Sequence, residues 1–104
     1  MSIRSIVESF RLVPATAERQ YVGQSISVPI RFGSPVVHYD DERVIVCMIE
    51  NHHHCVEFKL RKPLGVVGPG LRSIVGVVRS CSTDAVDRGL GVSFVIVVED
   101  CRLE

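Results

Sequence analysis

A chain of 104 residues, of which 46% are hydrophobic and 23% charged, has room for one domain with one core and does not have the composition of a disordered chain. Twelve basic and twelve acidic residues give a formal net charge of zero. This balance argues against a dedicated binder of duplex DNA, which carries a large positive excess, but it leaves room for a local basic patch.

No apolar run approaches the roughly 20 residues that span a bilayer, and the first residues lack the long apolar stretch of a signal peptide. We therefore expect a cytoplasmic protein without membrane contact, although a chain trimmed of an export signal would read the same. The final Leu103 and Glu104 are compatible with a vector-derived end.

The cysteines are widely spaced, with no Cys-x-x-Cys pattern. They are Cys47, Cys55, Cys81 and Cys101. Each lies in or beside an apolar run, where a free thiol behaves as a small hydrophobe. We therefore expect buried, reduced thiols in preference to a disulfide framework.

Residues 3–13 predict a short N-terminal helix within residues 1–14, because their apolar side chains recur at helical spacing and Pro14 ends the run. Its apolar side is expected to plug one end of a barrel. The apolar period then changes to two, which predicts a first strand over residues 24–32. One face of this strand carries Ile26, Val28, Ile30 and Phe32. Residues 33–42 are rich in turn formers and predict a loop.

Residues 43–50 and 55–61 predict the second and third strands, joined by a polar turn over residues 51–54. A tight hairpin buries one face consistently when three apolar pairs form. These pairs are Ile49 with Val56, Cys47 with Phe58, and Ile45 with Leu60. The opposite face then mixes apolar and charged groups, namely Val44, Val46, Met48, Glu57, Lys59 and Arg61. We expect this mixed face to meet a ligand.

Residues 62–70 are too rich in Gly and Pro for a helix and predict a loop before a fourth strand over residues 72–81. Gly76, at the centre of that strand, indicates a sharp bend or a close backbone approach. A polar loop over residues 82–91 leads to a fifth strand over residues 92–104.

Five such strands suit a small closed barrel, because closure removes the exposed edges of a very hydrophobic sheet. We therefore predict an all-β fold, a small five-stranded barrel with a short N-terminal helix. Residues 1–104 are expected to form a single domain, in which the barrel spans residues 24–104.

In residues 15–28 an Ala/acidic run leads to Tyr21 and Gly23, and in residues 97–103 an apolar strand ends in Asp100 and Cys101. These two stretches resemble the tRNA-anticodon-like OB domain family. Residues 15–28 resemble its opening, where an Ala/acidic run leads to Tyr-x-Gly-Lys; Tyr21 and Gly23 match this pattern, and Gln24 replaces the Lys. Residues 97–103 resemble its closing strand. The chain departs from the family in lacking a Gly at the end of strand one and a helix between strands three and four. The resemblance implies a five-stranded OB-type barrel, with residues 1–104 as a single OB-like domain that binds nucleic acid or another ligand. It supports architecture better than activity.

In OB domains the ligand surface lies over strands two and three and the loops beside them. In this chain the surface is expected to present Arg31, Tyr39, Met48, Lys59, Arg61 and Arg79. Basic groups beside a stacking aromatic are typical of single-strand binders. We therefore expect a non-catalytic module that binds single-stranded DNA or RNA weakly and in a salt-dependent way. The competing interpretation is a protein-interaction or self-assembly module that uses the apolar positions of the strand-two face.

A cluster of metal-ligating residues stands between the second and third strands, namely His52, His53, His54 and Cys55. Zinc suits such ligands, but a structural site needs a fourth and none stands at a recognisable spacing. We interpret the cluster as a polar hairpin tip and predict no metal or other cofactor. The acidic run at 40–42 is interpreted as solvated. Because no nucleophile or phosphate-cradling motif is present, we do not expect an enzyme.

Overall fold

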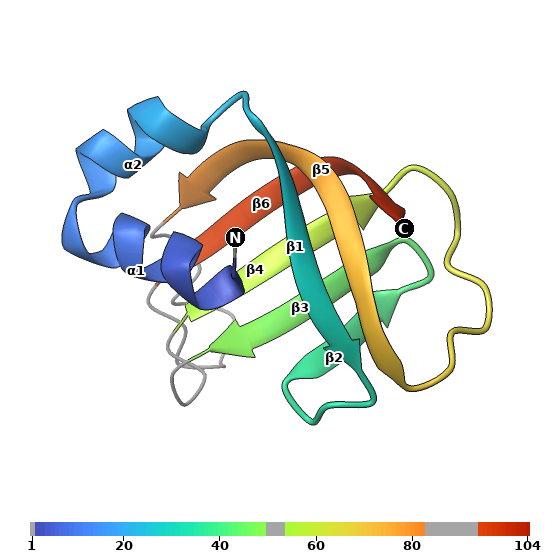
Figure 1. Ribbon diagram of the computed structural model, residues 1–104. Coiled ribbons are helices and arrows are strands. Elements are labelled where there is room, and N and C mark those ends of the chain that lie inside the picture. Colours follow the sequence, from blue (N-terminus) through green and yellow to red (C-terminus); the bar gives the residue numbers. More distant parts are fainter. Residues whose placement is uncertain (1, 50–53, 83–93) are drawn as a thin grey trace.

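The computed structural model describes residues 2–49, 54–82 and 94–104, which form one strongly curled sheet with two helices at one end (Figure 1). The elements follow in chain order: α1 (Ile3–Leu12), α2 (Pro14–Tyr21), β1 (Ser25–Phe32), β2 (Val37–Asp41), β3 (Val44–Ile49), β4 (His54–Leu60), β5 (Gly70–Ser82) and β6 (Phe94–Leu103). The described part of the chain is mainly strand and barrel-like, which agrees with the all-β prediction.

The six described strands are ordered β1-β5-β6-β4-β3-β2 across the sheet. All neighbouring strands run antiparallel except β4 and β6, which run parallel. The sheet curls so far that β1, at one edge, crosses in front of β4 and β3 in Figure 1. One core therefore collects side chains from both edges of the sheet.

Alternation in β1 explains how this core is built. Along the strand every second residue is buried, as the period of two predicted, and the buried residues are Ile26, Val28, Ile30 and Phe32. They pack against the inward-facing residues of the other strands, namely Ile45, Cys47, Val56, Phe58, Leu60, Ile74, Val78, Ile96, Val98 and Cys101. Burial of these β-branched and aromatic side chains is the main stabilising contribution to the fold.

Two helices stand where one was predicted. Ser2 caps α1, its hydroxyl oxygen accepting a hydrogen bond from the Ser5 backbone N–H at 3.2 Å. Pro14 ends α1 as predicted, but it also occupies the first turn of α2, where a proline costs no helical hydrogen bond. The Phe10 and Tyr21 rings lie 6.0 Å apart, and both side chains join the core. The helices thus plug one end of the curled sheet.

The prediction of a loop over residues 33–42 is wrong in part, because β2 forms within it. β2 pairs with β3 through Val37↔Cys47 and Tyr39↔Ile45. The predicted offset between the next two strands is also wrong: Ile49 pairs with His54, and Cys47 with Val56. The observed register differs by two residues, and an even shift leaves every side chain on its predicted face.

The outer face of β3 and β4 is more closed than the sequence predicted. Met48, Cys55 and Val95 form a second apolar cluster in which Met48 is only 8% exposed. Glu57 lies on this face and is also buried. Lys59, which belongs to the mixed face predicted to meet a ligand, remains exposed on β4.

Candidate functional site: a basic pocket at one end of the sheet

A β-bulge in β6 shapes the end of the sheet away from the helices. Between Val98 and Cys101 the strand contains one residue more than either neighbouring strand, since the pairing steps from Phe58↔Val98 to Leu60↔Cys101. Asp100, inside the bulge, has a φ of 54°, in the left-handed region that Asp tolerates better than most residues. The extra residue resets the alternation, so that Cys101 points inward and is 1% exposed.

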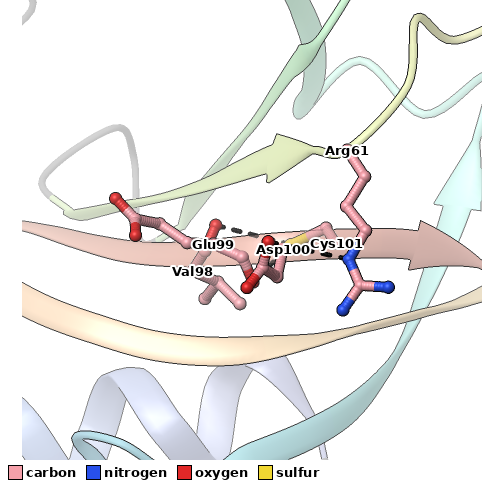
Figure 2. A network of polar contacts seen from close by, with 5 residues as sticks. All are labelled: Arg61, Val98, Glu99, Asp100 and Cys101. Atoms are coloured by element: carbon pink, nitrogen blue, oxygen red, sulfur yellow. Dashed lines mark hydrogen bonds and ion pairs between the residues drawn. The ribbon is translucent and has the colours of Figure 1, made fainter.

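The bulge also brings Asp100 to Arg61. Figure 2 shows Arg61 reaching from the end of β4 to Asp100 on β6, where its Nε lies 3.6 Å from the carboxylate Oδ1. The Cys101 thiol donates to the backbone oxygen of Val98 at 3.4 Å. Both side chains of the ion pair are more than half exposed, so the pair adds little to the stability of the fold.

The connection between β4 and β5, residues 61–69, forms one wall of the site. It is held to the sheet at Leu64, whose N–H donates to the Glu42 backbone oxygen at 2.6 Å. At the far end of the connection, Pro69 lies against Gly33. A Cβ atom added to Gly33 would lie 3.1 Å from the Cβ of Pro69. Leu64 and Val67 pack on the core, while Val66 points fully into solvent. The connection is therefore an anchored strap with an exposed apolar tip.

A pocket of about 500 Å³ lies between this strap and the ends of β5 and β6. Its apolar lining comes from Leu60, Pro63, Leu64, Val66, Val67 and Leu103. Four basic residues from three separate segments line it as well, namely Arg61, Lys62, Arg72 and Arg102. The described residues that line this space include no carboxylate. We call this space the basic pocket.

Hydrogen bonds at the rim orient two of these cations. Arg72 Nε donates to the backbone oxygen of Glu104 at 3.1 Å, and Arg102 Nη2 lies 3.3 Å from the Glu104 carboxylate Oε1. Lys62 is exposed and forms no ion pair within the described residues. Oriented guanidinium groups bind carboxylate or phosphate bidentately. The basic pocket is thus suited to an anionic group with an apolar portion.

The thiol in the pocket lining has no acid–base role near neutral pH. Burial raises the pKa of Cys101 from 9.0 to about 12; a backbone hydrogen bond from Lys59 opposes this increase, and Asp100 and Glu99 add to it. A protonated thiol is neither a nucleophile nor a metal ligand. Cys47 and Cys55 are buried as well, in agreement with the sequence prediction, whereas Cys81 is only partly buried, and none of the four cysteines forms a disulfide.

The residues predicted to bind a ligand do not gather in one place. Arg31 and Met48 line a second pocket, of about 320 Å³, near the start of α1. Tyr39 lines a third, of about 420 Å³. The Arg79 side chain is 73% exposed, and its Nε lies 3.9 Å from Glu99 Oε2. Lys59 remains on the outer face of β4.

Arg61 alone among the predicted residues lies in the basic pocket, where the fold joins it to Lys62, Arg72 and Arg102. The sequence reasoning missed these three. Lys62 directly follows the predicted third strand, which was the one available signal. Arg72 and Arg102 come into range only through the pairing of β4, β6 and β5.

His52 and His53 of the predicted polar hairpin tip lie outside the described residues, as does the side chain of His54. Cys55 is buried in the second apolar cluster. Over the ranges that the structure describes, no three His, Cys, Asp or Glu side chains are grouped to hold a metal ion. Neither α1 nor α2, the helices of the described chain, is long and apolar enough to cross a membrane.

Fold and site together define a barrel-like, mainly β domain with a basic pocket at the end of the sheet opposite its helices. Comparisons of the chain with models of known protein families, with curated proteins and with solved structures found no match.

Proposed function

We propose that this chain is a non-catalytic binding domain of the OB type that holds single-stranded nucleic acid, with phosphates in the basic pocket. The observation that carries this proposal is the convergence of Arg61, Lys62, Arg72 and Arg102 on one pocket whose described lining has no carboxylate. In a chain with zero net charge, such a local excess of positive charge is the feature that attracts a polyanion.

The strand arrangement supports the OB part of the proposal. β1 and β2 are consecutive in the chain, separated by residues 33–36, yet they form the two opposite edges of the sheet. If β1 and β2 are counted as one interrupted strand, the sheet has five strands, as an OB domain does. β3 and β4 then become strands two and three, the pair that carries the ligand surface in OB domains. The basic side chains of Lys59, Arg61 and Lys62 follow at the end of this pair.

Binding is expected to be weak and strongly dependent on salt. For single strands, log K falls with log salt at a slope of about −0.7 per neutralised phosphate, so four cations predict a slope of about −3 at most. Single-strand binders gain much of their remaining affinity from stacked aromatics. Tyr39 is the one solvent-exposed aromatic among the described residues, which limits this contribution.

Fluorescence anisotropy with a labelled 12-nucleotide single strand at 50–300 mM salt tests the proposal. Lys62→Glu and Arg102→Glu should each lower the affinity at least about fivefold and flatten the salt slope. Arg19→Glu makes the same charge change on α2, at the opposite end of the molecule, and should have little effect. Absence of binding at 50 mM salt, or equal losses in all three variants, would refute the proposal.

A protein-interaction module is the second candidate, and the exposed apolar side chains favour it. Val66, Leu71 and Tyr39 are all more than half exposed. Apolar assembly persists at high salt, whereas nucleic-acid binding is lost. Light scattering beside the salt titration therefore separates the two functions.

A further inference from the structure

We infer that the pocket beside Tyr39 is a base-binding site that prefers a base carrying an exocyclic amino group, such as cytosine; this inference rests on the proposed function. The pocket has a volume of about 420 Å³ and is lined by Tyr39, Asp41, Glu42 and residues 64–67. We call it the Tyr39 pocket.

The Tyr39 pocket and the basic pocket share a wall. Leu64, Gly65, Val66 and Val67 line both spaces, so the pockets lie on either side of the same short segment. The two sides differ in charge. The basic pocket has four cations, while the described lining of the Tyr39 pocket contains two carboxylates and no cation. A ligand that lies across Val66 therefore meets positive charge on one side and negative charge on the other.

A nucleotide has this division of chemistry. Its phosphate carries negative charge and suits the basic pocket, while its base is an uncharged ring with polar edges. Carboxylates repel a phosphate but accept hydrogen bonds from amino groups, as Asp and Glu do from cytosine N4. Charge complementarity thus places the backbone of the strand on the basic side and the base beside Tyr39.

Tyr39 is preorganised to stack a base. Its ring stacks on Phe32, with a centroid separation of 6.3 Å and an interplanar angle of 20°, and Phe32 is itself buried in the core. Tyr39 remains 52% exposed, so the ring still offers surface to a ligand. An aromatic ring already held by the core loses little freedom on binding, which preserves the affinity gained from stacking.

Glu42 is the better hydrogen-bond acceptor of the two carboxylates. Asp41 Oδ1 already accepts from the Arg43 backbone N–H at 2.6 Å, which closes the turn between β2 and β3. The backbone of Glu42 is fixed by the hydrogen bond from Leu64, while its side chain is exposed. Cytosine N4 is a donor, whereas O4 of thymine or uracil is an acceptor that a carboxylate repels. Glu42 is therefore the specificity-determining residue.

Anisotropy titrations with labelled dC12 and dT12 at one low salt concentration test the inference. We expect dC12 to bind at least about fivefold more tightly than dT12. Glu42→Gln should reduce this ratio below about twofold, because an amide serves both bases. Glu18→Gln makes the same side-chain change on α2, outside both pockets, and should leave the ratio unchanged. Circular dichroism spectra of all variants check that they fold.

Further variants separate stacking from charge. Tyr39→Ala should weaken both oligonucleotides about tenfold, whereas Tyr39→Phe should retain binding. Lys62→Glu should weaken both equally and preserve their ratio. Equal affinities for dC12 and dT12, or a ratio that Glu42→Gln leaves intact, would overturn the inference while the proposed function stands. Failure of every oligonucleotide to bind would overturn both.

Discussion

Gly76 of β5 lies so close to Cys101 of β6 that a Cβ atom at position 76 would be 2.6 Å from the Cys101 sulfur. The same atom would lie 2.8 Å from Val98 Cγ1 and 2.9 Å from the Glu99 backbone oxygen. All three neighbours belong to the bulged part of β6. A side chain at position 76 is therefore incompatible with the bulge, and the bulge in turn aims Asp100 at Arg61.

Gly76→Ala should lower the free energy of unfolding by about 1–3 kcal/mol, because the neighbouring strand must move to admit the methyl group. Urea denaturation measures the change. Gly65→Ala and Gly68→Ala are matched controls, since nothing lies within 4 Å of a Cβ at either position. A Gly76→Ala variant as stable as these controls would show that the two strands are not in close contact.

Asp100 should tolerate small residues and reject β-branched ones. Because Asp100 has a φ of 54°, Asp100→Asn and Asp100→Gly should change the free energy of unfolding by no more than about 0.5 kcal/mol. Asp100→Val should lower it by about 1–2 kcal/mol. Ser27→Val, at an exposed and regular position of β1, is the control and should be neutral or stabilising. Similar stability for Asp100→Val and Asp100→Asn would contradict the left-handed conformation.

Asp100→Asn should strengthen oligonucleotide binding about two- to fivefold at low salt, because it removes the carboxylate that offsets the charge of Arg61. The gain should disappear as salt screens the site. Glu18→Gln, on α2, removes a carboxylate far from the basic pocket and should change little. If the Asp100→Asn variant binds the oligonucleotide no more tightly than the unmodified protein at 50 mM salt, Arg61 does not contact the bound oligonucleotide.

Alkaline pH should destabilise the fold through its buried thiols. Burial raises the pKa of Cys47 to about 12, as it does that of Cys101, above the ordinary value of 9.0. The native state then binds more protons than the unfolded state, so the stability is complete below pH 9 and is lost as the pH rises toward 12.

Urea denaturation at pH 8 and pH 10.5 tests this pH dependence. Replacing Cys101 with Ala should reduce the loss between the two pH values by about 1–2 kcal/mol. Thiol labelling at pH 8 provides an independent check, with the half-buried Cys81 expected to react before Cys47 and Cys101. If the free energy of unfolding depends on pH in the same way in the unmodified protein and in Cys101→Ala, the Cys101 thiol does not contribute to the alkaline loss of stability.

The faces of the strands were predictable, but their offset was not. Alternation in β1 identified its buried side chains, and the same parity placed Ile45 and Phe58 in the core. A period of two is unchanged by a shift of two residues, so alternation alone could not determine that Ile49 pairs with His54. The close approach at Gly76 was predictable, because a glycine weakens a strand of β-branched residues and is expected there where a neighbouring strand leaves no room for a side chain.

Elements with few apolar contacts escaped prediction. α2 buries only Ala17 and Tyr21 and shows little helical periodicity. β2 has the sequence VHYDD, which resembles a loop, and it exists because the edge of β3 offers backbone partners. The basic pocket escaped for a different reason: its cations come from three segments that only tertiary pairing brings together, and the bulge that resets the direction of Arg102 leaves no local pattern.

The order of the strands has a consequence for synthesis on the ribosome. β1 emerges before its partner in the sheet, β5, which begins 38 residues after β1 ends, and β4 needs β6, the last described strand. A nascent chain can complete the β2–β3–β4 meander while β1 still lacks its hydrogen-bonded neighbour. Such distant pairings slow folding, so the curled sheet is complete only after β6 has been translated.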